Sequence, residues 1–297
     1  MRRPSSKLLG INRIVMSGNI FNKLWVIESL PSGELRTGKN LFDNQLDKAK
    51  QVQQDLVVEF ADPTTKSELF DVLEKIRNEA LSGIYPMIHF ECHGCEDGLG
   101  TASEELVEWD EIKEILIEIN RATKLNLMIV IAACNGAHLI KVSTKLDAAP
   151  FWAIIGPEIE VTDVQIQDNF GRFYESLFSD LDGDKAIDIL NEGAGHQGRT
   201  YHFLSAAGLF SRAYRAYYKS HCVGKGKEER IEHLVSEEMK NPDVKRRGMA
   251  WTRQQVKRGL ASEEQHFDKL RKRFFFIADC PENDARFYLS KDDIVAT

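Results

Sequence analysis

Ile88-His89-Phe90-Glu91-Cys92-His93-Gly94 and Val130-Ile131-Ala132-Ala133-Cys134-Asn135-Gly136 are the two stretches that decide the fold of this chain. Each is an apolar, strand-like run that stops at a reactive residue, His93 in the first and Cys134 in the second. A helical pattern from Glu108 to Asn120 fits between them. Strand, helix, strand is the right-handed crossover unit, and its two parallel strands usually lie side by side. We therefore expect an imidazole and a thiol at the carboxyl ends of neighbouring strands, where open α/β sheets place their sites.

Five apolar runs outline the sheet: residues 23–27, 56–60, 87–90, 127–132 and 151–155. Such continuous apolar runs indicate strands that are buried on both faces. Helical patterns accompany them at residues 41–53, 67–80, 108–120, 163–178 and 185–192. This alternation predicts an α/β fold with a doubly wound, mainly parallel sheet.

The character of the chain changes after Gly193. An aromatic, Ala-rich stretch is followed by a polar hinge, three charged helical patterns and a strand-like run of Phe, at residues 202–218, 224–227, 228–240, 251–259, 263–272 and 273–277. We therefore divide the chain into a sheet core, residues 1–195, and a helical C-terminal extension with a regulatory or docking role, residues 196–297.

Composition narrows the class of protein. The five cysteines are odd in number and form no disulfide framework, which favours free thiols in a reducing compartment. We find no secretory segment, and the longest apolar run, residues 127–134, is too short to span a bilayer, so we expect a cytoplasmic protein. The net charge of −7 makes a general nucleic-acid binder unlikely.

Residues 241–273 stand apart from this acidic balance, with ten Lys and Arg against four Asp and Glu. Three interpretations remain open for this basic segment. It can be a solvated helix face, a surface that docks to an acidic partner, or the nucleic-acid-binding part of a regulator.

The reactive residues also have plain structural interpretations. A free cysteine such as Cys134 is often a small buried hydrophobic residue. Cys92 and Cys95 form a C-x-x-C that could begin a zinc site, but a second pair at the usual spacing is missing. The Gly-rich stretch at residues 193–198 lacks the strand that a dinucleotide site requires before it. We therefore expect no metal and no cofactor.

Three segments together resemble a known family. His93-Gly94 after one strand and Ala133-Cys134-x-Gly136 after the next resemble the caspase-like peptidases of clan CD. The segment from Trp152 to Asp163, followed by the helical patterns at residues 170–177 and 185–190, is similar to the CHAT group of that clan. The resemblance covers roughly residues 20–195. Asn135 and Ala132 depart from the Arg and Gln that caspases often carry there, which argues against caspase-type specificity for Asp.

This resemblance implies a cysteine endopeptidase. Cys134 would be the nucleophile, His93 the general base and acid, and the backbone N–H groups of Gly94 and Cys134 the oxyanion hole. Family members of this kind suggest a protein substrate, such as a neighbouring pore-forming effector in bacterial defence. A non-catalytic adaptor on the same fold is the alternative from another class.

The loop after the fifth strand is acidic, with Glu158, Glu160 and Asp163. In the caspase-like fold this loop borders the groove beside the nucleophile. We therefore expect a basic residue before the cut bond (the P1 residue), held by Glu158 or Asp163. The plain interpretation is that these acids cap the helix that starts near Asp163. The connection at residues 138–150 is short, so we also expect an enzyme that works as an intact chain.

Overall fold

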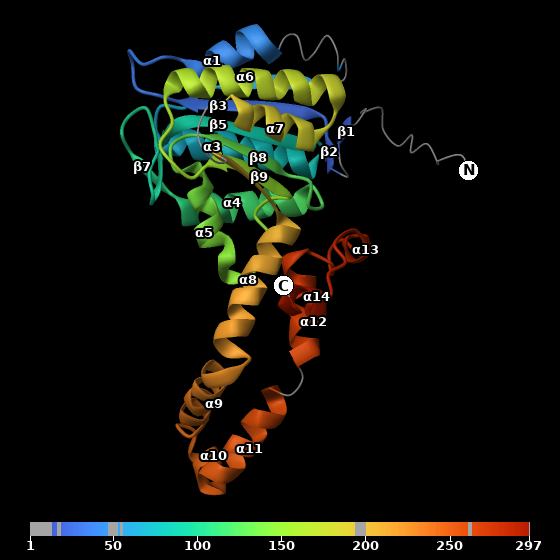
Figure 1. Cartoon of the computed structure of the whole chain (residues 1–297). Coiled ribbons are helices and arrows are strands. Elements are labelled where there is room, and N and C mark those ends of the chain that lie inside the picture. The colour runs from blue at the N-terminus through green and yellow to red at the C-terminus, as the bar shows by residue number, and fades with distance from the viewer. Residues whose placement is uncertain are drawn as a thin grey trace, which may run out of the picture. The chain divides into compact units, whose positions relative to one another are not determined.

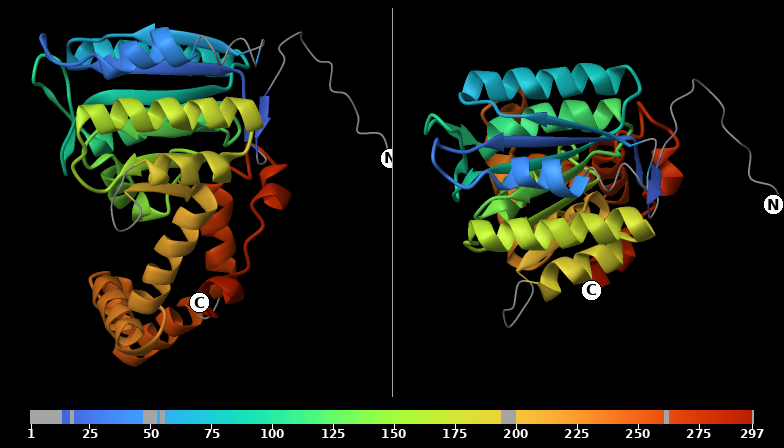
Figure 2. Two further views of the ribbon diagram at one scale, coloured as in Figure 1. Left: turned by 45° about the horizontal axis from the view of Figure 1, so that its top comes forward. Right: turned by 90° about the horizontal axis from the view of Figure 1, so that it is seen from above.

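The computed structural model describes residues 14–16, 19–46, 53, 56–193, 200–260 and 263–296. The chain forms two compact units (Figures 1 and 2). The first, the sheet unit, comprises Met1–Ser143 and Ala149–Ala206, and the second, the helical unit, comprises Thr144–Ala148 and Ala207–Thr297. The predicted boundary between residues 195 and 196 lies outside the described residues.

The sheet unit is built on a mostly parallel sheet with the strand order β10-β9-β8-β5-β3-β4. The strands are β3 (Lys23–Ser29), β4 (Val57–Ala61), β5 (Pro86–Gly94), β8 (Met128–Ala132), β9 (Ala153–Pro157) and β10 (Tyr201–Ser205). All pair in parallel except β10, which runs antiparallel to β9. The predicted α/β class and mainly parallel sheet are confirmed, because all five apolar runs became strands of this sheet.

Helices cover both faces of the sheet (Figure 2). Helices α3 (Lys66–Leu81) and α4 (Trp109–Ala122) pack together on one face. Helices α1 (Thr37–Leu41), α6 (Asp163–Asp180) and α7 (Gly183–Glu192) lie on the other. Every residue of β3 and β8 is buried, which explains why residues 24–27 of β3 and all of β8 are apolar.

Several short elements were not predicted from the sequence. A hairpin of β6 (Gly98–Gly100) and β7 (Leu106–Glu108) follows His93, and β1 (Ile14–Met16) pairs with β2 (Asn19–Phe21). Strands of three residues are too short to show a period of two. The helix predicted at residues 41–53 was partly wrong, since α1 passes into a π-helical turn at Phe42–Leu46. Residues 47–52 of that prediction lie outside the described residues.

The helical unit contains most of the C-terminal extension. Its helices are α8 (Ala206–His221), α9 (Gly224–Glu238), α10 (Pro242–Arg247), α11 (Met249–Leu260), α12 (Glu263–Phe274), α13 (Asn283–Arg286) and α14 (Lys291–Ala296). An aromatic cluster forms its core, where Phe210 lies 5.3 Å from both Phe274 and Phe275 between ring centroids, and Tyr214 lies 4.8 Å from Phe267.

Three sequence predictions in this region were wrong. The polar hinge at residues 224–227 is the first turn of α9. The strand at residues 273–277 is instead the end of α12 and a turn, because these Phe side chains pack on Phe210 rather than in a sheet. Residues 201–205, assigned to the helical extension, form β10 of the sheet. Within the described part of the chain, no helix is long and apolar enough to cross a membrane.

Candidate active site

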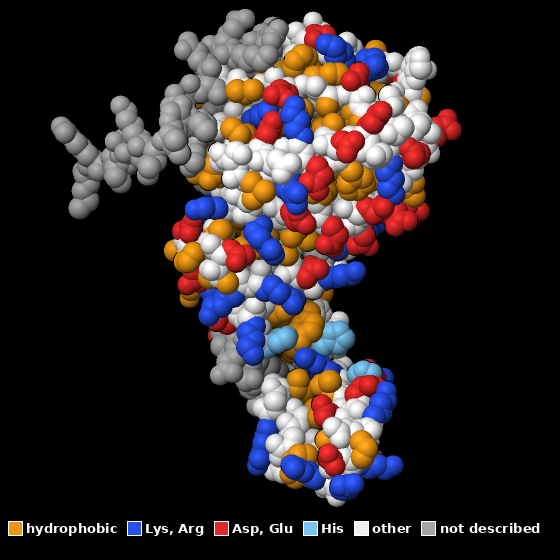
Figure 3. All heavy atoms as spheres, turned by 180° about the vertical axis from the view of Figure 1, so that it is seen from behind, with side chains coloured by type: hydrophobic (Ala, Val, Ile, Leu, Met, Phe, Trp, Pro, Cys, Tyr) orange, Lys and Arg blue, Asp and Glu red, His pale blue; other side chains and the backbone are white. Residues whose placement is uncertain are grey.

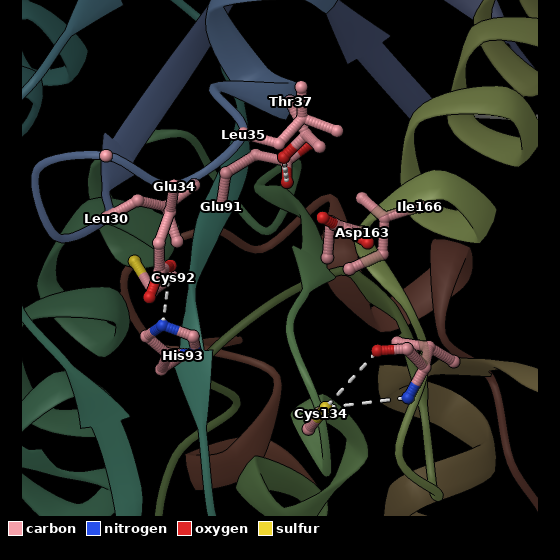
Figure 4. A pocket seen from close by; sticks show the side chains of 13 residues that line it. Leu30, Glu34, Leu35, Thr37, Glu91, Cys92, His93, Cys134, Asp163 and Ile166 are labelled. Atoms are coloured by element: carbon pink, nitrogen blue, oxygen red, sulfur yellow. Dashed lines mark hydrogen bonds and ion pairs between the residues drawn. The ribbon is translucent and has the colours of Figure 1, made fainter.

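The site lies at the carboxyl ends of β5 and β8. These strands pair in parallel from Met87 opposite Met128 to Glu91 opposite Ala132. His93 is the last residue but one of β5 and Cys134 follows β8 by two residues, so both emerge at the same edge, as the sequence predicted. Both side chains line one cavity of about 430 Å³ (Figure 4).

The Cys134 side chain contacts the backbone of Val161, in the loop between β9 and α6. The N–H of Val161 donates to the Cys134 sulfur at 3.5 Å, and the thiol lies 3.6 Å from the carbonyl oxygen of the same residue. Asn135 adopts a left-handed backbone conformation with φ 56°, which turns the chain sharply after the cysteine and which Asn tolerates better than most residues. The thiol is partly exposed and accessible from the cavity.

His93 interacts with Glu34, a residue that was not predicted from the sequence. Its Nε2 lies 2.8 Å from the Glu34 carboxylate, and both side chains line the cavity. In the part of the chain that the structure describes, the hydrogen-bond partner of the Cys134 thiol is Val161 and not His93. Catalytic hydrogen bonds are often long in a free enzyme and tighten when substrate binds.

Gly94 is required by a close approach of two backbones. A Cβ atom on this residue would lie 2.0 Å from the Cys134 carbonyl oxygen and 3.1 Å from the Ala133 side chain. Backbone atoms cannot yield as a flexible side chain can, so only glycine fits. The two predicted oxyanion-hole residues, Gly94 and Cys134, are therefore packed directly against each other.

Only one of the two predicted substrate-binding acids lines the cavity. Asp163 lines the cavity at the first turn of α6 (Figure 4). Glu158 does not line it, and instead lies 3.6 Å from His202 of β10. Asp163 does not serve as the N-cap of α6. The N-cap is Thr162, whose side chain forms a capping box with Gln165.

A second acid, Glu91, lines the cavity and was also missed. It is buried, and its two oxygens accept hydrogen bonds from Thr37 Oγ1 at 2.7 Å and from the His89 ring at 2.9 Å. His89 is fully buried and its Nδ1 lies 3.0 Å from the Tyr174 hydroxyl, so it is a hydrogen-bonded residue of the core. The signal that could have identified Glu91 is a charged residue within an otherwise largely apolar, buried strand.

The remaining cysteines differ sharply from Cys134. Cys92 is buried, and burial raises the pKa of its thiol to about 12. Cys95 is exposed, whereas Cys222 and Cys280 are buried. Among the described residues, no three His, Cys, Asp or Glu side chains gather where they could hold a metal ion. The Gly-rich residues 194–198 lie outside that part of the chain.

Compared with known proteins, the chain matches no protein-family model and no curated sequence. Its class is defined by fold and site: an α/β protein with a mostly parallel sheet, whose neighbouring strand ends bring a histidine and a cysteine to one acidic cavity.

Proposed function

We propose that this protein is a cysteine endopeptidase of the caspase-like, CHAT-type class, which cuts a protein substrate after a basic residue. One observation carries the proposal: His93 and Cys134 leave the ends of paired parallel strands and line the same cavity. A thiol and an imidazole in one accessible cavity are the parts of a nucleophile and its base.

Acylation follows from these groups. His93 accepts the proton of the Cys134 thiol, and the thiolate sulfur attacks the carbonyl carbon of the substrate. The carbonyl oxygen becomes an oxyanion, which the backbone N–H groups of Gly94 and Cys134 stabilise. The tetrahedral intermediate then collapses, the peptide C–N bond breaks, and the His93 imidazolium gives its proton to the leaving amine. A thioester on Cys134 remains.

Deacylation reverses these roles. His93, now neutral, removes a proton from a water molecule that attacks the thioester carbonyl. The C–S bond breaks, the substrate leaves as a carboxylic acid, and the proton on His93 returns to the sulfur. No oxidant, metal or cofactor enters this balance.

The lining of the cavity supports a basic P1 residue. Leu30, Leu35, Val161 and Ile166 form apolar walls, which suit the aliphatic stem of a long side chain. Glu34, Glu91 and Asp163 supply carboxylates, and no Lys or Arg is among the described residues that line the cavity. An aliphatic stem with a cationic head is the shape of Lys and Arg. Asp163 is our choice for the pairing acid, because its carboxylate has no basic partner among the described ion pairs.

A second candidate function rests on the helical unit. Its α10 and α11 carry Lys245, Arg246, Arg247, Lys257 and Arg258, and Figure 3 shows blue side chains around this part of the molecule. The Arg247 guanidinium lies 4.7 Å from the ring centre of Trp251. A cationic surface with an aromatic ring can bind single-stranded nucleic acid. Oligonucleotide binding that weakens steeply with salt would favour this regulator, and its absence favours the peptidase.

The peptidase is tested by substrate trapping. The Cys134→Ala protein should retain a substrate from native lysate, and added wild-type protein should cut that substrate after Arg or Lys. A non-catalytic adaptor would also capture a partner, but the wild-type protein would leave it intact. Mapping the new N-terminus by mass spectrometry therefore separates the two classes.

A further inference from the structure

We infer that Glu34 is a positioning residue for His93. It lies on a segment, residues 30–41, that is anchored to β5, the strand that carries His93. This inference rests on the proposed peptidase function. It adds a third member, from a different strand connection, to the pair of His93 and Cys134. The sequence resemblance assigns no role to this segment.

The contact itself fixes the imidazole ring. Glu34 Oε2 lies 2.8 Å from His93 Nε2, and the dashed line in Figure 4 joins them. A carboxylate only accepts hydrogen bonds, so Nε2 must carry the proton and Nδ1 keeps the lone pair in the neutral ring. Nδ1 is therefore the atom that accepts the thiol proton. When it does so, Glu34 faces the resulting imidazolium and offsets its charge, while the Nε2 proton stays in place.

The pair contributes little to folding, which argues for a role in the site. The His93 side chain is 60% exposed and that of Glu34 is 42% exposed. Ion pairs between such exposed side chains typically add little to the stability of a fold. Removing Glu34 should therefore change what His93 does much more than it changes the stability of the protein.

Glu34 is held in place from both sides. On its N-terminal side is a turn in which the Glu34 N–H donates to the Pro31 carbonyl at 3.3 Å, and Gly33 supplies the positive φ of 96°. On its C-terminal side, the buried Glu28 carboxylate pairs with Arg36 and accepts from the N–H groups of Gly38 and Lys39 at 2.9 and 3.1 Å. These N–H groups begin α1 and have no partner within the helix.

The same segment is anchored to the strand that carries His93. Thr37 donates to Glu91 on β5 at 2.7 Å. Gly38 packs so closely on this strand that a Cβ atom there would lie 2.8 Å from the Glu91 side chain. Because His93 and Glu91 belong to one strand, the segment and the histidine are fixed to a common support. The position of Glu34 relative to the ring is thus set by buried contacts rather than by the exposed pair alone.

The test compares Glu34→Ala and Glu34→Gln with wild-type protein. We expect Glu34→Ala to lower kcat by about 10²-fold with little change in KM, since positioned acid–base groups contribute about 10² to 10⁴. Glu34→Gln keeps an oxygen that can accept from Nε2 and should retain more activity than Glu34→Ala. Melting temperature should be unchanged in both. The matched control is Glu74→Gln, which removes an exposed carboxylate that lies 2.8 Å from Arg77 on α3, outside the cavity.

A second readout keeps this test separate from the peptidase proposal. Iodoacetamide should alkylate Cys134 at least several-fold more slowly in Glu34→Ala than in wild type, whether or not any substrate is cut. Equal alkylation rates and kcat values within twofold of each other would overturn the role of Glu34. If wild-type protein cuts nothing while Glu34→Ala still slows alkylation, the positioning role stands and the peptidase function fails.

Discussion

Gly94 and Cys134 approach so closely that no side chain can stand between them: a Cβ on Gly94 would lie 2.0 Å from the Cys134 carbonyl oxygen. The two residues lie on neighbouring strand ends, and their N–H groups are the proposed oxyanion hole. The contact explains why glycine must follow the histidine. A single methyl group added at residue 94 would therefore force the two strand ends apart.

We therefore expect Gly94→Ala to lower peptidase activity by about 10²- to 10³-fold, because the clash of its Cβ with the Cys134 carbonyl oxygen displaces the backbone N–H of residue 94 from the oxyanion hole. The backbone must also shift, so the melting temperature should fall. Gly100→Ala is the matched control on β6, where a Cβ would make an ordinary 3.5 Å contact with the His93 side chain. Full activity of Gly94→Ala, measured as kcat/KM on a peptide substrate, would contradict this role.

Alkylation should rank the cysteines by environment. Cys134 should react first with iodoacetamide near pH 7.5, because His93 can take its proton. Cys92 should stay unlabelled in the folded protein up to at least pH 9, since burial raises the pKa of its thiol to about 12 and keeps it protonated there. Cys95 is exposed but does not line the cavity and should react at an intermediate rate.

Peptide mapping by mass spectrometry measures these rates. His93→Ala should slow labelling of Cys134 to about the rate of Cys95. If Cys95 and Cys134 react equally fast in wild-type protein, the imidazole is not acting on the thiol.

Specificity should depend on Asp163 and not on Glu158. Asp163→Asn should lower kcat/KM for Arg and Lys at P1 by roughly 10- to 100-fold, because a hydrogen bond between charged groups contributes about 1.5–3 kcal/mol. Glu158→Gln should leave the preference intact, since Glu158 faces His202 outside the cavity. Fluorogenic peptides that differ only at P1 measure this. A wild-type preference for Asp or a small apolar residue would show that the acidic cavity does not select P1.

The enzyme should work as an intact chain. The connection after Cys134 is occupied by short helical turns, η2 (Gly136–His138), α5 (Leu139–Val142) and η3 (Ser143–Lys145). Its residues Thr144–Ala148 belong to the helical unit, where Arg273 donates to the Leu146 carbonyl at 2.9 Å. Mass spectrometry of active protein should find no cut between Lys141 and Ala149. A cut there that activity requires would refute this expectation.

The sequence predicted the sheet and the placement of the reactive pair because both follow from local patterns. The apolar runs of β3, β5, β8 and β9 are buried on both faces, and β5 and β8, which are joined by the crossover helix α4, are neighbours. These two rules are enough to predict that His93 and Cys134 emerge at the same edge of the sheet.

Glu34 and Glu91 could not be predicted in the same way. Glu34 lies on a turn whose position depends on Glu28 and on the docking of α1, contacts that no periodicity records. β10 was missed because its sequence, Tyr-His-Phe-Leu-Ser, is short and only partly apolar. The Phe run at residues 274–276 has strong strand propensity, but packing on Phe210 at the end of a helix prevailed.

The most direct test of the proposed dyad is digestion of a peptide library made from a proteome with a protease that cuts after acidic residues, so that Lys and Arg remain internal. Wild-type, Cys134→Ala and His93→Ala proteins are incubated with the library, and new N-termini are identified by mass spectrometry. We predict that wild-type protein produces new termini that follow Arg or Lys, and that both variants produce none while keeping the wild-type melting temperature. No new termini with wild-type protein, or the same termini with Cys134→Ala, would contradict the assignment of Cys134 and His93 as the catalytic pair.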